Sequence, residues 1–320
     1  MCSSDLTDLP LSASERRAVV LDACTKLAGR LGDEESVRAA ALRAFADMWF
    51  SSEAAADEHA EQLVAVVAAC QKECAEELIV GLLRDAMAAN QEVCACLCDA
   101  VVSLFAASPT GSPRLASCVF VLDLFCQAAP ALLVPYVTVL APNLRPAPGR
   151  ALTDADCAAV NHLAAIVRRV APLWTSPSDA ETVRLVESLI LLLRTEDPRQ
   201  LRIARECTAA LAAVCDAHAT TYAVLSDLFD HFCGVLSSGS ASRVALWSAF
   251  YSLGVLCQAS GNLSPARNGS MLFSVVRART VFLAALQRHR SDSDLMCSAH
   301  RGLCALCARW VALLQDGEIT

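Results

Sequence analysis

The residues with the clearest potential for chemistry are a histidine and two cysteines near the end of the chain. Cys304 and Cys307 form a Cys-x-x-Cys pair, and His300 lies four residues before Cys304. On a helix these three positions share one face, where two thiolates and an imidazole could serve as zinc ligands. A structural zinc site needs a fourth ligand, and the chain has no second Cys-x-x-Cys pair to supply it. We therefore expect ordinary helix packing here and no cofactor. An enzyme or metal protein that uses this face is the alternative.

The other cysteines have the pattern of buried structural residues. The chain contains 17 cysteines at irregular spacings, and most of them lie beside alanine and leucine. Cys94, Cys96 and Cys98 alternate along a predicted helix, so they point in different directions and make a poor metal site. A free cysteine behaves as a small hydrophobic residue, whereas disulfide frameworks are typical of short secreted chains. We expect free thiols in a reducing compartment.

Two clusters of arginine are the candidate sites for contact with a partner. A guanidinium can donate two parallel hydrogen bonds to a phosphate, so either cluster could touch a nucleic-acid backbone. Acidic residues flank both clusters, and the alternative is a solvated helix face with internal ion pairs. The aromatic residues of a single-strand platform are not interleaved with these arginines. The candidate contacts to phosphate, DNA or a protein partner are Arg194, Arg199, Arg202 and Arg205, and Arg277, Arg279, Arg288 and Arg290.

The sequence lacks the common signatures of catalysis and of membrane insertion. It contains no G-x-S-x-G, H-E-x-x-H, phosphate-binding glycine loop or dinucleotide fingerprint, and its 6 histidines are scattered. The most apolar stretch, residues 115–144, is interrupted by Asp123, Pro130 and Pro135, and falls short of the roughly 20 apolar residues of a membrane span. We expect a protein that is not an enzyme, with no small-molecule ligand and no membrane contact.

The elements that carry these residues are predicted to be helices. Hydrophobic residues make up 55% of the 320 residues and aromatic residues only 5%, so alanine and leucine supply much of the apolar content. Both residues favour helices, whereas sheets prefer β-branched and aromatic residues. With 12 glycines and 12 prolines, the apolar segments contain few helix breakers. A chain of this length exceeds the usual single domain unless it is a repeat array.

Residues 30–50 have the pattern of the second helix of a HEAT hairpin. An acidic turn at 32–35 precedes a helix whose apolar residues fall on one face. Such a helix buries its apolar face only against neighbours, so further hairpins should follow. Similar acidic turns recur near Asp197 and Asp292, at intervals that correspond to about 41 and 47 residues per repeat, within the range of HEAT and armadillo arrays.

We predict an all-α, HEAT/armadillo-like α-solenoid of stacked helical hairpins. A proline-rich linker at 141–152 separates N-terminal repeats at 1–140 from C-terminal repeats at 153–320, within one continuous solenoid. Residues 1–110 hold 8 basic and 18 acidic residues, whereas residues 261–320 hold 7 and 4, which indicates an oriented surface. Helices are predicted at residues 14–29, 33–50, 58–70, 73–89, 92–107, 114–127, 131–140, 154–170, 179–194, 199–217, 220–236, 242–258, 272–290 and 294–314.

A series of short segments occurs in an order, and at spacings, that are found in a known family. The segments are 32–35 (GDEE), 48–50 (MWF), 66–70 (VVAAC), 115–125, 130–134 (PALLV), 160–173, 177–178, 207–214 and 252–257 (SLGVLC). In this order they resemble the sister chromatid cohesion protein 2/Nipped-B family, the large subunit of the cohesin loader, and the resemblance extends over roughly residues 30–310. The matched residues are mostly core and turn positions, so they indicate a scaffold and no individual contact residue.

The resemblance implies a hook-shaped HEAT-repeat protein of the nucleus. It implies binding to the cohesin ring, through the SMC ATPase heads and the kleisin subunit, and to DNA in chromatin. It also implies that ATP hydrolysis by cohesin is stimulated and the ring is loaded onto chromatin for sister chromatid cohesion in the cell cycle. Family members are far longer, and the acidic first 110 residues offer little basic surface for DNA. The alternative is a general HEAT-repeat adaptor, such as a transport receptor or a condensin-type or phosphatase scaffold subunit.

Overall fold

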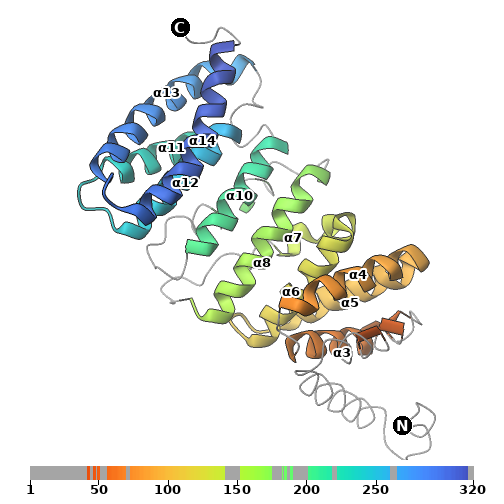
Figure 1. Ribbon diagram of the computed structural model, residues 1–320. Helices are drawn as coiled ribbons and strands as arrows, with labels where there is room; N and C mark the ends of the chain where they lie inside the picture. The colour runs from red at the N-terminus through yellow and green to blue at the C-terminus, as the bar shows by residue number, and fades with distance from the viewer. Residues whose placement is uncertain are drawn as a thin grey trace, which may run out of the picture. The chain divides into compact units, whose positions relative to one another are not determined.

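The protein is built from helices wherever its structure is described (Figure 1). The computed structural model describes residues 56–69, 73–140, 152–174, 201–217, 222–259 and 265–315, with a few positions within 42–50 and 182–189. No strand occurs within these ranges. None of the helices in them has the length and apolar character of a membrane span. The helix predicted at 14–29 and most of the linker at 141–152 lie outside the described residues. Of the helix predicted at 179–194, residues 182, 184, 185, 188 and 189 are described, and all of them are helical.

Most predicted helices agree with the observed ones to within two or three residues. The agreement follows from the local periodicity and capping signals, which the sequence shows directly. The observed elements are α3 (Ala56–Ala69), α4 (Glu73–Ala89), α5 (Gln91–Ala107), α6 (Pro113–Ala128), η3 (Pro130–Tyr136), α7 (Val137–Leu140), α8 (Asp154–Val170), η5 (Ala171–Leu173), α10 (Leu201–Ala217), α11 (Tyr222–Ser237), α12 (Arg243–Ala259), α13 (Pro265–Arg288) and α14 (Ser293–Gln315).

Two elements differ from the prediction, both at prolines. Residues 130–136 form a 3₁₀ helix instead of an α-helix, and Pro135 inside it has no backbone N–H for an α-helical hydrogen bond. The helix predicted at 272–290 begins earlier, because α13 already starts at Pro265. Proline fits the first position of a helix, where its missing N–H costs nothing. The sequence signal was therefore a helix start and not a break.

Residues 1–133 form the first of two compact units, in which α3, α4, α5 and α6 pack against one another. Its core includes Leu63, Leu97 and Phe105, each about 1% exposed. Trp49, in the stretch that first indicated a HEAT helix, is 2% exposed, and its carbonyl lies 3.1 Å from Nδ1 of His59 on α3. A carbonyl oxygen can only accept, so Nδ1 carries the proton and donates this hydrogen bond.

Residues 134–320 form the second unit, which is a stack of helical hairpins. Helices α8, α10, α12 and α14 are successive neighbours, while α11 packs on α13 (Figure 1). The hairpins α11–α12 and α13–α14 therefore stack with like helix on like helix, which is the packing of HEAT and armadillo repeats. The predicted fold class, an all-α HEAT/armadillo-like arrangement of stacked helical hairpins, is confirmed.

The contact between α12 and α14 is unusually close, because two glycines face each other there. A Cβ atom added to Gly254 would lie 2.2 Å from the carbonyl oxygen of Gly302, and one added to Gly302 would lie 2.1 Å from that of Phe250. The Phe250 ring packs edge-on against Phe282 of α13, with centroids 4.9 Å apart. The absence of two side chains thus allows the backbones of α12 and α14 to touch, and the phenylalanines fill the space beside them.

Candidate functional site

Three of the four arginines of the second predicted cluster lie on α13, where two of them bind α11, and Arg290 lies in the turn after α13. Arg277 makes an ion pair with Asp230 of α11. Arg288 donates to the carbonyl oxygens of Leu236 and Ser237, which end that helix. The last carbonyls of a helix lack intrahelical donors, so a cation there is stabilised both by hydrogen bonds and by the helix dipole. These two arginines therefore fasten α13 to α11 within the protein.

The other two arginines of this cluster, Arg279 and Arg290, are exposed and have no carboxylate partner among the described residues. The guanidinium carbon of Arg279 lies 4.3 Å from the ring centroid of Trp310 on α14, which is a cation–π contact. This contact orients the guanidinium without neutralising its charge. Arg279 and Arg290 are thus the members of the cluster whose charge is available to a partner.

The first predicted arginine cluster falls largely outside the described residues. Arg194 and Arg199 precede α10, and of Arg202 and Arg205 only the helical backbone is described. Glu206, the acidic residue beside them, lies 3.3 Å from Arg168 of α8 and so helps to join α10 to α8. A contact role for this cluster stays a prediction.

A groove of about 330 Å³ lies between α13 and α14. We call it the α13–α14 groove. Its apolar residues are only partly covered, since Leu283 is 39% and Val311 50% exposed, whereas Leu306 is 1% exposed. Large exposed side chains that are contiguous are a mark of interaction surfaces, while single ones are ordinary. The groove is lined by Arg279, Leu283, Leu303, Leu306, Cys307, Trp310 and Val311.

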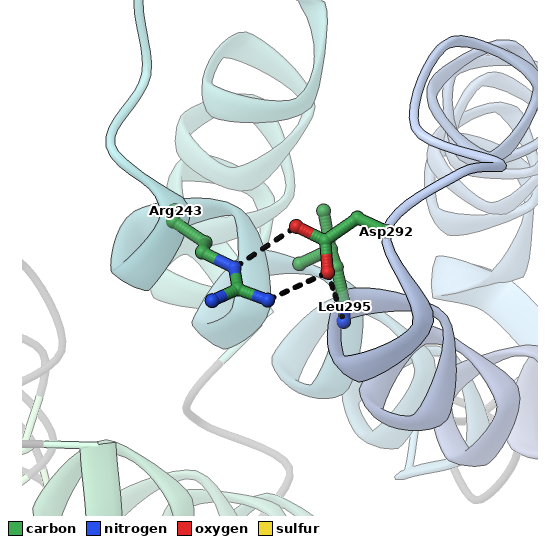
Figure 2. Close-up of polar contacts among 3 residues, drawn as sticks. All are labelled: Arg243, Asp292 and Leu295. Carbon is green, nitrogen blue, oxygen red and sulfur yellow. Dashed lines mark hydrogen bonds and ion pairs between the residues drawn. The ribbon is translucent and has the colours of Figure 1, made fainter.

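A bidentate ion pair holds the start of α14 against the start of α12 (Figure 2). Nε and Nη2 of Arg243 donate to the two carboxylate oxygens of Asp292, at 2.9 and 2.7 Å. Asp292 also accepts the backbone N–H of Leu295 at 3.0 Å, so that it is the N-cap of α14. The acidic turn predicted at 291–294 therefore caps a helix and joins two successive hairpins.

Neither of the two candidate metal-binding groups, His300 with Cys304 and Cys307, and the cysteines of α5, has the arrangement of a metal site. Sγ of Cys304 and Nε2 of His300 are 3.8 Å apart, and Cys307 lies one turn further along the exposed face of α14. Within the described ranges, no three His, Cys, Asp or Glu side chains are arranged to hold a metal ion. In the other group Cys94 and Cys98 are buried, and burial raises the pKa of the Cys94 thiol to about 11 and that of Cys98 further. Such thiols are protonated and unreactive at neutral pH.

A second groove, of about 360 Å³, lies in the first unit beside α3 and α6. Its two charged residues pair with each other, since Nη2 of Arg114 donates to Oε1 of Glu61 at 3.3 Å. The charge in this groove is therefore balanced within the protein, which distinguishes it from the α13–α14 groove. The lining residues are Glu61, Val64, Ala65, Ala68, Leu104, Pro113, Arg114 and Ser117.

Comparison with known proteins finds relatives that are named Nipped-B-like proteins. No family model matches the chain. Nipped-B-like protein B of Danio rerio is 25% identical over 274 residues, which cover 75% of this chain and 9% of that protein. Nipped-B-like protein of Homo sapiens is 23% identical over the same share of the chain, and Nipped-B-like protein A of Danio rerio is 21% identical over 89% of it. The chain is similar to the Nipped-B family.

This similarity confirms the resemblance that the sequence predicted. The chain spans about a tenth of the length of the Nipped-B-like proteins it matches. Among solved structures, a designed armadillo repeat protein aligns with 88% of the chain at 16% identity and a TM-score of 0.28. The fold class accordingly rests on the helix packing described above.

The sequence did not reveal the α13–α14 groove or the role of Arg243. Trp310 lies half-buried in the groove wall. One signal was available. Leu303, Leu306 and Trp310 follow the spacing of a single packed face, and Val311 widens that face beyond what one neighbouring helix covers.

Proposed function

We propose that this chain is a portion of the helical-repeat scaffold of a nuclear cohesin-loading factor. It contacts cohesin subunits and has no catalytic chemistry of its own, so that any ATP hydrolysis takes place in cohesin. The observation that carries the proposal is the similarity to Nipped-B-like proteins over 75–89% of the chain. Stacked helical hairpins support it further, because such arrays present long surfaces to protein partners.

The charge distribution favours contact with protein over contact with DNA. Residues 1–110 carry 18 acidic and 8 basic residues, and a phosphate backbone would be repelled by such a surface. On α13, Arg277 and Arg288 are already engaged with α11. Among the described members of the second cluster, Arg279 and Arg290 are left for a phosphate, and this is fewer than the contacts of a typical DNA-binding surface.

Co-purification tests the proposal directly. The tagged 320-residue chain is mixed with purified kleisin and with the dimerised SMC heads, and retention is measured at low and physiological salt. We expect retention of at least one cohesin subunit, with ATP hydrolysis by cohesin measured in parallel. Arg290→Glu should weaken retention if the α13 cluster takes part, and Arg43→Glu is the matched control, because Arg43 is exposed in the other unit.

A negative result is also informative. If the folded chain retains neither kleisin nor SMC heads and leaves ATP hydrolysis unchanged, the loader function is refuted for this portion. A general helical-repeat adaptor would then be the better description. Binding to DNA alone, with no cohesin subunit retained, would contradict the preference for protein contact argued above.

A further inference from the structure

We propose that the α13–α14 groove binds an amphipathic helix that presents an apolar stripe and an acidic residue beside it. This goes beyond the proposed function, because it fixes the chemistry of a bound segment and does not depend on cohesin as the partner. The groove runs between two helices of one hairpin and has an apolar floor with a cation at its wall. Helix-in-groove recognition uses such a surface, with anchors at positions i, i+3 or i+4, and i+7 of the bound helix.

The apolar part of the argument rests on incomplete burial. Leu283 on α13 and Val311 on α14 are 39% and 50% exposed, while Leu306 below them is 1% exposed. The half-buried ring of Trp310 forms part of the wall. A helix laid along these residues would remove apolar surface from water, at about 25 cal/mol per Å² buried. Tryptophan and arginine are also the residue types most enriched among the energetically dominant contacts of interfaces.

The acidic part of the argument rests on Arg279. Its guanidinium is held over Trp310, and within the described residues no carboxylate neutralises it. Arg277, two residues before it on α13, pairs with Asp230 instead. A helix that covered the groove with only apolar residues would desolvate an unpaired cation, which is costly, whereas a carboxylate at its edge would pair with it. The groove of the first unit does not require an acidic residue in a bound segment, because Arg114 there already pairs with Glu61.

A designed peptide pair tests both parts on the complete 320-residue chain. The probe is a fluorescein-labelled peptide of about 16 residues with leucines at helical i, i+4, i+7 and i+11 spacing and glutamates beside them. The matched peptide carries lysine at each glutamate position. Fluorescence anisotropy should show that the glutamate peptide binds about ten-fold more tightly, and that added salt narrows the difference.

Alkylation locates the peptide without any substitution. Cys307 lines the groove and is exposed, and Cys297 is exposed on the same helix outside the groove. Saturating glutamate peptide should slow the reaction of Cys307 with iodoacetamide several-fold and leave that of Cys297 unchanged, as measured by mass spectrometry. Equal rates at Cys307 with and without bound peptide would overturn the assignment to this groove.

Three variants complete the test. Val311→Asp should abolish peptide binding, and Arg279→Glu should reverse the preference in favour of the lysine peptide. Leu173→Asp is the control, because Leu173 is 43% exposed and lies in η5, outside the groove lining. All three sites are exposed, so the variants should fold, which circular dichroism checks. Equal binding of the two peptides, no binding of either, or loss of binding only in Leu173→Asp would overturn the proposal. A concentration-dependent dimer that Val311→Asp dissociates would overturn it in favour of a second copy of this chain.

Discussion

The glycine contact between α12 and α14 gives the sharpest prediction of this structure. Replacing Gly302 by alanine would place a Cβ atom 2.1 Å from the carbonyl oxygen and 2.9 Å from the carbonyl carbon of Phe250. An ordinary carbon-to-oxygen contact is about 3.3 Å or longer, so the two helices would have to separate by roughly 1 Å. Both obstructing atoms belong to the backbone, so no side chain can rotate away to relieve the clash.

The free-energy change follows from two opposing effects. Alanine is the better helix former by about 1 kcal/mol, which stabilises the variant. Overpacking costs about 1–3 kcal/mol, and a gap of 0.5–1 Å along the interface forfeits a quarter to a half of the dispersion energy of each contact beside it. The edge-on contact of Phe250 with Phe282 lies beside this interface and would weaken as well. Because the clash involves backbone atoms, the overpacking cost should lie in the upper part of its range, and we expect Gly302→Ala to lower the free energy of unfolding by about 1–2 kcal/mol net.

Urea denaturation followed by circular dichroism measures the loss, and amide hydrogen exchange localises it to α12 and α14. Gly234→Ala in α11 and Gly81→Ala in α4 are matched controls, because an added Cβ meets nothing within 4 Å at either position. Both controls should gain about 0.5–1 kcal/mol from the reduced flexibility of the unfolded chain. If Gly302→Ala is as stable as these controls, the close contact between the helices is wrong.

Three further predictions concern protonation and helix caps. Burial raises the pKa of Cys94 from about 9 to about 11, so the unfolded chain releases this proton at lower pH than the folded one. The free energy of unfolding should therefore fall as pH rises from 9 to 11, and it should fall less steeply in Cys94→Ala. Urea titrations in which the free energy of unfolding does not change over this pH range would contradict the prediction. Asp292→Ala removes both the N-cap of α14 and the ion pair, and it should lower the free energy of unfolding by about 1–2 kcal/mol, as measured by thermal denaturation. Arg243→Ala removes only the exposed ion pair and should lower it by less than about 1 kcal/mol. An equal loss of stability in the two variants would show that the cap is unimportant. Thr153 and Asp156 form a capping box at the start of α8. Thr153→Ala should lower the free energy of unfolding by about 1 kcal/mol, whereas Thr153→Ser should leave it almost unchanged. A similar melting temperature for the two variants would refute the role of the hydroxyl.

The sequence predicted the helices well because their signals are local. Helix α4 was predicted at 73–89 and is observed at Glu73–Ala89, since its apolar residues recur with helical spacing and its ends lie at polar residues. Helix α8 was predicted at 154–170 and is observed at Asp154–Val170, and Thr153 before it caps the helix by accepting the N–H of Asp156 at 3.2 Å. The 3₁₀ segment at 130–136 was missed, because periodicity alone does not separate a 3₁₀ turn from a short α-helix.

The candidate site was predicted only in part, because its contacts join residues far apart in the chain. The sequence indicated that Arg277 and Arg288 are exposed cations on one helix, but not that Asp230 and the end of α11 would meet them, about 50 residues earlier. The same applies to Gly254 and Gly302, whose helical segments gave no sign of a backbone contact. Periodicity shows which face of a helix is apolar, whereas the identity of the neighbour across that face depends on tertiary packing.

The junction of Arg243, Asp292 and Leu295 has a mechanical consequence. Arg243 is the first residue of α12, and Asp292 directly precedes α14, so the contact joins two neighbouring helices at the ends where they begin. A link at one end resists sliding of one helix along the other, but it leaves tilting about that end possible. The arginines that fasten α13 to α11 and the contact of Gly254 with Gly302 add further links between the same two hairpins. The hairpins α11–α12 and α13–α14 should therefore move together as one block. Because Arg243 is exposed, salt screening should weaken this end link first, while the backbone contact still holds the helices together.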